Sequence, residues 1–187
     1  MSPLLGAYYA ILGPLHLTLD SLATQGTSAE DGAENDATYP SFLQPLVTPV
    51  RAFLADGGNP EKTVALASYK NWPAVVLNLG VLAVSLEISA ILYKFNVPHA
   101  YISAALSILA VQSMRSFDST RQGFVLAVFC GVAAPLSELV LINVFGLWQY
   151  PHPNVFGPGG VPSWVFWCYF LYTSGVGNLA RFLSKND

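Results

Sequence analysis

The chain has 187 residues, of which 53% are hydrophobic and only 10% are charged. Soluble domains carry roughly 25% charged residues, so a chain this short has too few charges to cover a water-exposed surface. The net charge of −3 also argues against nucleic acid as a partner. The apolar residues gather into runs of about 20, the length that crosses a hydrocarbon core. Composition therefore predicts an integral membrane protein.

The apolar runs predict an all-α fold, a polytopic bundle of five transmembrane helices that forms a single membrane domain over residues 1–187. The predicted spans cover about residues 4–23, 72–94, 97–116, 122–146 and 163–183. Asn96-Val97-Pro98 predicts a tight break between the second and third spans. Small residues in the last span predict the close approach of a neighbouring helix; they are Ser174, Gly175, Gly177 and Ala180.

Residues 24–70 separate the first two spans and have a different composition. Their first part places Glu30, Asp31, Glu34 and Asp36 among small and polar residues, without a basic residue. Such a stretch cannot bury enough apolar surface to order itself, which predicts a flexible acidic linker. Residues 41–54 carry apolar side chains on one helical face, and this leaves open a short segment lying on the membrane surface.

The basic residues are distributed unequally between the two sides of the predicted bundle. Only Lys94 falls on one side. The other seven fall on the opposite side, namely Arg51, Lys62, Lys70, Arg115, Arg121, Arg181 and Lys185. Because cytosolic loops carry an excess of Lys and Arg, this places the linker, the turn at Asp118 and the C-terminus in the cytosol.

Glu87 and Glu138 lie inside predicted spans, where an ionised carboxylate costs about 3 kcal/mol on insertion scales. Each is expected to be protonated, paired, or turned toward a polar cavity. The favoured interpretation is a hydrogen bond between helices or a partly wetted pocket. The alternative is a general acid in a membrane enzyme of isoprenoid or lipid metabolism. The sequence shows no metal-ligand spacing, Gly-rich phosphate loop or nucleophile elbow, so we expect neither metal nor cofactor.

Two further pairs of polar residues lie near the predicted cytosolic ends of spans. His16 and Asp20 share one helix face, either near the wetted interface or as a polar handle inside the bundle. Asp118 is followed three residues later by Arg121, within reach if the turn is helical. These two residues form either an exposed charge pair worth under about 1 kcal/mol or a docking point for another membrane protein.

The order of several short motifs resembles the Insig family, the insulin-induced-gene proteins of the endoplasmic reticulum membrane. The family's Phe-Asp-Arg-Ser-Arg-Ser-Gly-Phe turn corresponds to Phe117-Asp118-Ser119-Thr120-Arg121-Gln122-Gly123-Phe124. Its Tyr-Gln-Tyr-x-x-Pro loop corresponds to Trp148-Gln149-Tyr150-Pro151-His152-Pro153, followed by Ser163-Trp164. Its closing Gly-Asn-Ile-Gly-Arg corresponds to Gly177-Asn178-Leu179-Ala180-Arg181, and Leu19-Asp20-Ser21 is similar to its Ile-Asp-Ser. The resemblance covers about residues 3–24 and 68–185.

The resemblance implies a non-catalytic, lipid-sensing regulator of sterol and isoprenoid synthesis, located in the endoplasmic reticulum membrane. Its partner would be a membrane protein of the Scap or HMG-CoA reductase type, held at the cytosolic face by Asp118 and Arg121. Lipid contacts would fall on Tyr101, Ala105 and Met114, with Glu87 and Glu138 as polar groups of the bundle. Tyr101, Ala105 and Met114 replace the Gln, Thr and Trp of the family, which leaves open a different sterol or a diacylglycerol-like lipid. A structural subunit of a larger membrane complex is the remaining alternative.

Overall fold

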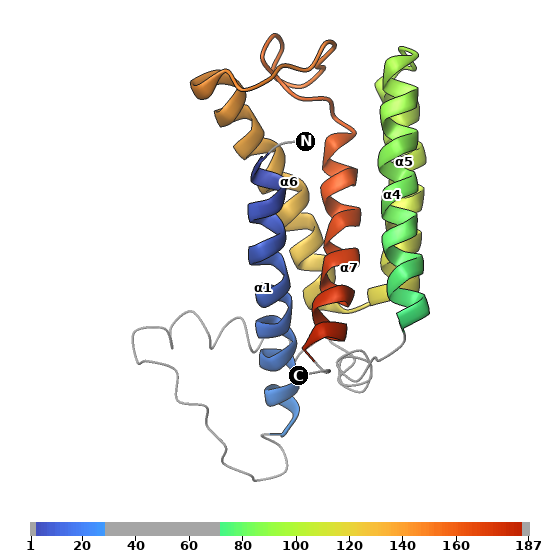
Figure 1. Ribbon diagram of the computed structural model, residues 1–187, viewed down its shortest axis with the longest axis vertical. Coiled ribbons are helices and arrows are strands. Elements are labelled where there is room, and N and C mark those ends of the chain that lie inside the picture. The colour runs from blue at the N-terminus through green and yellow to red at the C-terminus, as the bar shows by residue number, and fades with distance from the viewer. Residues whose placement is uncertain (1–2, 29–71, 185–187) are drawn as a thin grey trace.

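The computed structural model describes residues 3–28 and 72–184, and this part of the chain is all-helical (Figure 1). Its five α-helices are α1 (Pro3–Ser28), α4 (Trp72–Lys94), α5 (His99–Ser113), α6 (Arg121–Phe145) and α7 (Val165–Leu183). A single π-helical turn, η2 (Met114–Asp118), follows α5 directly. The described residues form no β-strand beyond an isolated bridge between Val155 and Val161, in the loop that joins α6 to α7.

Helix α7 lies at the centre of the bundle and packs against α1, α4, α5 and α6 (Figure 1). Every residue from 168 to 178 is buried. The small residues of α7 allow this packing, as predicted. A Cβ atom at Gly177 would lie only 2.6 Å from His16 Nε2, and one at Gly13 would lie 3.3 Å from Ala180 Cβ. The contact between α1 and α7 therefore depends on residues that let the two backbones come close together.

The predicted spans agree with the helices in number and nearly in extent, with differences at their ends. Helix α1 continues to Ser28, so the first five residues of the predicted linker are helical. Nothing before Ser28 stops the helix, because no proline follows Pro14 there. The remainder of the predicted linker, including the proposed surface segment at residues 41–54, lies outside the described residues.

The other helix boundaries follow from local backbone chemistry. Asn96 adopts a φ of 54° in the break before Pro98, and α5 begins at His99. Thr120 caps the N-terminus of α6 by accepting a 3.2 Å hydrogen bond from the Gly123 amide. Gly146, with a φ of 60°, ends α6 in the left-handed conformation that glycine adopts without strain.

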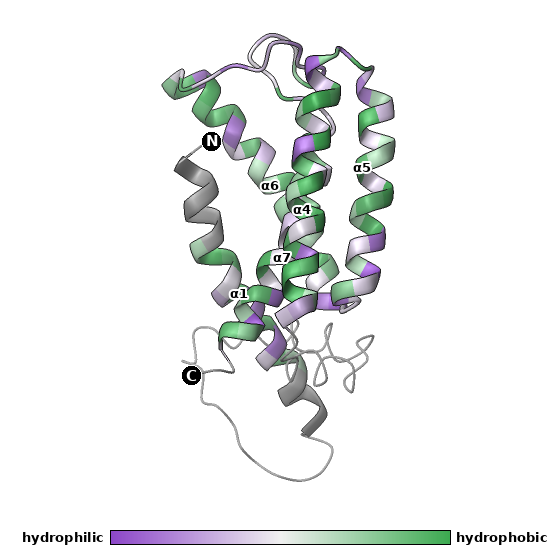
Figure 2. Cartoon of the chain, turned by 45° about the vertical axis from the view of Figure 1, so that its right-hand side comes forward, coloured by the Kyte–Doolittle hydropathy of each residue, from purple (hydrophilic) through white to green (hydrophobic). Residues whose placement is uncertain are grey.

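Two of the described helices, α4 and α6, are long and apolar enough to cross a membrane by length and composition. Figure 2 shows hydrophobic residues over most of their length. Large apolar side chains on both helices point away from the bundle; Leu77, Val84, Phe129 and Val144 are 57–69% exposed.

Candidate functional site

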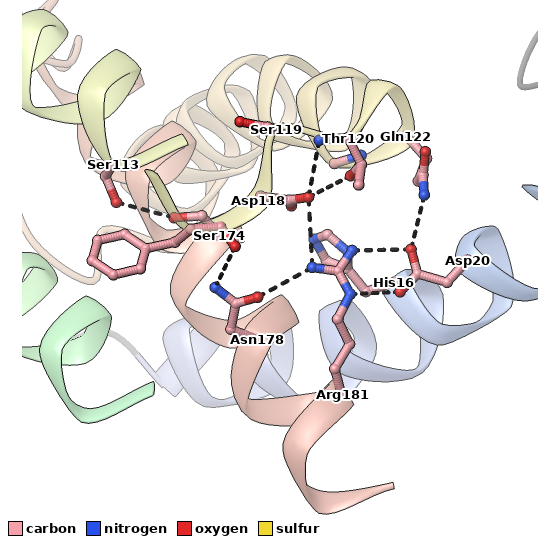
Figure 3. A network of polar contacts seen from close by, with 12 residues as sticks. His16, Asp20, Ser113, Asp118, Ser119, Thr120, Gln122, Ser174, Asn178 and Arg181 are labelled. Atoms are coloured by element: carbon pink, nitrogen blue, oxygen red, sulfur yellow. Dashed lines mark hydrogen bonds and ion pairs between the residues drawn. The ribbon is translucent and has the colours of Figure 1, made fainter. Parts of the chain in front are cut away.

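A buried network of charged side chains joins α1, η2 and α7, with Arg181 at its centre (Figure 3). Arg181 is 1% exposed. Its Nε donates to Asp20 Oδ2 at 2.5 Å and its Nη2 donates to Asp20 Oδ1 at 2.9 Å. The planar guanidinium thus meets both carboxylate oxygens in a fork, the strongest geometry for such a pair. The contact ties the end of α7 to α1.

Asp118 in η2 is the second carboxylate of this network and is 1% exposed. Its Oδ1 lies 3.5 Å from Arg181 Nη1. The same oxygen accepts hydrogen bonds from the Thr120 hydroxyl and, at 3.3 Å, from the Thr120 amide. Asn178 adds a link, because its Nδ2 donates to the Phe117 carbonyl at 3.1 Å while its Oδ1 accepts from Arg181 Nη1 at 3.2 Å. The turn between α5 and α6 is therefore fastened to α7.

The backbone of η2 brings Asp118 into this position. The Ser119 amide donates to the Met114 carbonyl at 2.7 Å, the five-residue spacing of a π turn, and Ser119 then takes a φ of 54°. π turns of this kind occur frequently at functional sites. Gly123 leaves the space that the carboxylate occupies, since a Cβ atom there would lie 2.1 Å from Asp118 Oδ2. The buried position of the Asp118 carboxylate therefore requires a glycine at position 123.

His16 and Gln122 complete the network. His16 is fully buried, and its Nδ1 lies 3.4 Å from Arg181 Nη2. Because a guanidinium can only donate, Nδ1 must accept, which places the ring proton on Nε2. Gln122 Nε2 donates to Asp20 Oδ1 at 3.0 Å. With one guanidinium facing two carboxylates, hydrogen bonds from neutral side chains disperse the remaining negative charge.

The structure contradicts one of the two interpretations of each polar pair. His16 and Asp20 lie inside the bundle, so the polar handle is confirmed and the wetted interface is wrong. The exposed charge pair at Asp118 is also wrong, because Asp118 is buried and forms an ion pair with Arg181. Arg121, the first residue of α6, is half-buried. A docking role for Asp118 and Arg121 stays a prediction.

Glu138 lies on α6 in a second buried polar group. It is 6% exposed and accepts hydrogen bonds from the hydroxyls of Tyr169 on α7, at 2.6 Å, and Tyr150 in the following loop, at 2.8 Å. Burial, and after it the Glu138 carboxylate, raise the pKa of Tyr150, so this hydroxyl remains a donor at physiological pH. The predicted hydrogen bond between helices is confirmed.

The other predicted lipid contacts do not form one surface. Glu87 is exposed on α4, whereas Glu138 on α6 is buried. On α5 and η2, Tyr101 is 70% exposed whereas Met114 is 5% exposed and belongs to the core. Ala105, which lies between them in the sequence, is half-buried. Tyr101 and Met114 also differ by more than three helical turns, so a single lipid head could not touch both.

Sequence reasoning missed the partners of the three buried acids. An acid inside a span predicts a donor, but only the folded bundle shows that Tyr150 and Tyr169 serve Glu138. It also shows that Arg181 serves both Asp20 and Asp118, and that Gln122 serves Asp20. No three His, Cys, Asp or Glu side chains of the described residues group as ligands for a metal ion. No family model, curated protein or solved structure matches the chain.

Proposed function

We propose that this chain is a non-catalytic, lipid-sensing membrane regulator of sterol and isoprenoid synthesis. It crosses the endoplasmic reticulum membrane five times, holds a sterol or a related lipid in its helix bundle, and has its C-terminus in the cytosol. At that face it captures a membrane protein of the Scap or HMG-CoA reductase type.

One observation carries the proposal: the separate segments that resemble the Insig family meet at one place. Three of these segments are far apart in sequence: Leu19-Asp20-Ser21, the turn from Phe117 to Phe124, and Gly177–Arg181. Asp20, Asp118 and Arg181 nevertheless join them in a single buried network (Figure 3). Motifs that matched by accident would have no reason to complete one another's ion pairs and hydrogen bonds. The resemblance was drawn from sequence motifs alone, so the contacts among these segments in the folded chain support it independently.

The apolar surface supports the membrane placement. Helices α4 and α6 have the length and hydropathy of spans, and their outer faces carry large apolar side chains. The network around Arg181 lies at the same end of the bundle as Arg115 and Arg121, whereas Lys94, the other basic residue of the described part, lies at the far end of α4. The positive-inside rule assigns the more basic end to the cytosol.

The burial of Asp118 gives it a particular role in the proposed partner site. Asp118 cannot touch a partner while Arg181 and Thr120 enclose it, so it acts as a positioning residue that sets the shape of the turn. The exposed residues of this turn are Arg115, Ser116 and Ser119. A partner would contact these side chains, with Arg121 beside them.

The geometry around Glu138 favours a regulator over the enzyme alternative. Two tyrosine hydroxyls donate to its two carboxyl oxygens, so both oxygens serve as acceptors in this arrangement. An acid that protonates an isoprenoid double bond needs a proton of its own to deliver. Tyr150 and Tyr169 instead hold Glu138 as an acceptor, suited to a hydroxyl group of a bound lipid.

Lipid binding is tested with the full-length protein in phosphatidylcholine vesicles and a photoreactive cholesterol analogue. We expect saturable labelling that unlabelled cholesterol or diacylglycerol competes away, and lipid mass spectrometry after gentle purification identifies the native ligand. Labelling that rises linearly without competition would overturn the lipid-sensing proposal. An isoprenoid product that disappears with Glu138→Gln, while lipid labelling remains, would establish the enzyme alternative.

A further inference from the structure

The loop that joins α6 to α7 carries no charged side chain. Residues 146–163 contain no Asp, Glu, Lys or Arg, and Glu138 is the single charged residue between Arg121 and Arg181. Charged residues make up roughly a quarter of a soluble domain, so a stretch of this length in water would ordinarily contain several. The loop does contain Trp148 and Tyr150, two residue types that are enriched where a chain meets the membrane–water interface.

Hydrogen bonds hold this loop against the ends of α4 and α6. The His152 amide donates to the hydroxyl of Tyr93, which immediately precedes the last residue of α4, at 2.8 Å. Asn143 Nδ2, in the last turn of α6, donates to the Gly159 carbonyl at 3.0 Å. A Cβ atom at Gly159 would lie only 2.7 Å from Asn143 Oδ1. The loop therefore lies at the level of the helix ends, opposite the buried network (Figure 1).

Residues 155–161, here named the loop hairpin, turn back on themselves. Val155 and Val161 exchange two backbone hydrogen bonds, of 3.1 and 3.2 Å, and the Gly160 amide donates to the Gly157 carbonyl at 2.9 Å. Only glycine fits at position 160, because a Cβ atom there would lie 1.8 Å from the Val155 carbonyl oxygen. These bonds reduce the number of backbone groups that need water, which lowers the cost of entering a less polar medium.

Phe156 lies at the tip of the loop hairpin and is exposed. Its φ is 64°, the left-handed conformation that a bulky residue rarely adopts, yet its side chain is 72% exposed. Packing within the bundle therefore does not explain a phenylalanine at this position. Phe145 and Leu147 are also exposed, on either side of the residue that ends α6. Because Asn143 holds the hairpin against this end of α6, the exposed apolar surface of the hairpin continues that of the helix.

We propose that the loop hairpin lies in the lipid headgroup region at this end of the bundle and inserts the ring of Phe156 between the lipids. The inference rests on the membrane placement in the proposed function and adds a contact between the loop and the bilayer. Lipid is favoured over a water-soluble partner protein, because the loop has no charge and adjoins the apolar face of α6. Interfacial anchors of this kind set the tilt and rotation of a span, so the hairpin holds α6 at its depth.

The test uses the full-length protein in phosphatidylcholine vesicles, with a nitrobenzoxadiazole (NBD) label on Phe156→Cys. Quenching by a 5-doxyl phosphatidylcholine reports lipid contact, and quenching by iodide on both sides of the vesicles reports water contact. Ser116→Cys, in the exposed part of η2, is the reference for water, and Val144→Cys, exposed on α6, is the reference for lipid. The parent protein controls for labelling of its two cysteines, both of which are buried.

We expect the label at Phe156→Cys to emit at shorter wavelength than at Ser116→Cys, to be quenched by the doxyl lipid and to be protected from iodide. A second label, at Leu147→Cys, tests the ring itself. Its quenching by the doxyl lipid should fall when Phe156→Asp is added and persist with Phe156→Trp, because Trp suits the interface and Asp does not. Equal quenching in the Asp and Trp variants would overturn the assignment of Phe156 as the anchor.

Iodide quenching at Phe156→Cys that equals that at Ser116→Cys would overturn the inference. Protection from both quenchers would also overturn it, in favour of a second copy of the chain that covers the hairpin. Doxyl quenching at Val144→Cys without quenching at Phe156→Cys refutes the hairpin contact alone. Absence of quenching at Val144→Cys refutes the membrane placement and this inference with it. Quenching at both sites without photoreactive cholesterol labelling refutes lipid sensing alone.

Discussion

Arg181→Met should destabilise the bundle more than any other single charge removal among the described residues. Arg181 is 1% exposed and faces Asp20 through two hydrogen bonds and Asp118 at 3.5 Å. Methionine fills much of the volume but leaves two buried carboxylates without their cation. Removing one partner of a buried ion pair typically costs about 3–5 kcal/mol. For a chain of this size that corresponds to a fall in Tm of about 6–20 °C.

Thermal unfolding in a mild detergent, followed by far-UV circular dichroism, measures this effect. Arg115→Met is the matched control, because Arg115 is exposed in the neighbouring η2 and should change Tm little. Adding Asp20→Asn and Asp118→Asn to Arg181→Met removes the unbalanced charges, so the triple variant should recover much of the lost stability through non-additivity. Equal Tm values for Arg181→Met and Arg115→Met, or a triple variant less stable than the single one, would refute the reasoning.

Three more predictions concern space and hydrogen bonds. Gly123→Ala should lower the free energy of unfolding by at least about 2 kcal/mol, because the added methyl group would clash with the Asp118 carboxylate. Gly80 has open space around it, so Gly80→Ala should raise the free energy of unfolding by up to about 1 kcal/mol in the same thermal assay. Gly177→Ala should push His16 away and loosen α1 from α7, which hydrogen exchange of α1 would detect; unchanged protection would contradict the close contact. Tyr150→Phe should lower stability by about 1.5–3 kcal/mol, and by much less in a Glu138→Gln background; equal losses would show that the hydrogen bond contributes nothing.

The capture of a Scap-type or reductase-type membrane domain provides the test of Asp118 as a positioning residue. Asp118→Asn should reduce co-purification and alter protection of the turn in hydrogen exchange, because the charge that holds Arg181 and Thr120 is lost. Arg115→Ala should reduce capture while leaving the turn's protection unchanged. Both variants should retain cholesterol labelling. Loss of labelling in Asp118→Asn would instead indicate that the whole bundle had been disturbed.

Much of the architecture was accessible from the sequence because it depends on local chemistry. Apolar length placed all five helices, and Pro98 with Asn96 placed the break between α4 and α5. Hydropathy could not place the end of α1, because backbone hydrogen bonds carry the helix to Ser28, beyond its apolar part. The sequence also singled out several polar residues of the buried network. It predicted that Asp118 is exposed, because the nearest cations in the sequence are its flanking arginines.

Residue order alone determined that the chain forms apolar helices, that carboxylates would lie inside them, and that small residues would let α7 be crowded by its neighbours. The pairing of those polar groups was decided only by tertiary structure. Asp20, Asp118 and Arg181 come from different helices, and the energy that joins them arises from distance and exclusion of water, neither of which is encoded in a local pattern. The same applies to Glu138 and Glu87: identical in sequence terms, one is enclosed by tyrosines and the other faces outward, because only packing decides which side of a helix becomes the interior.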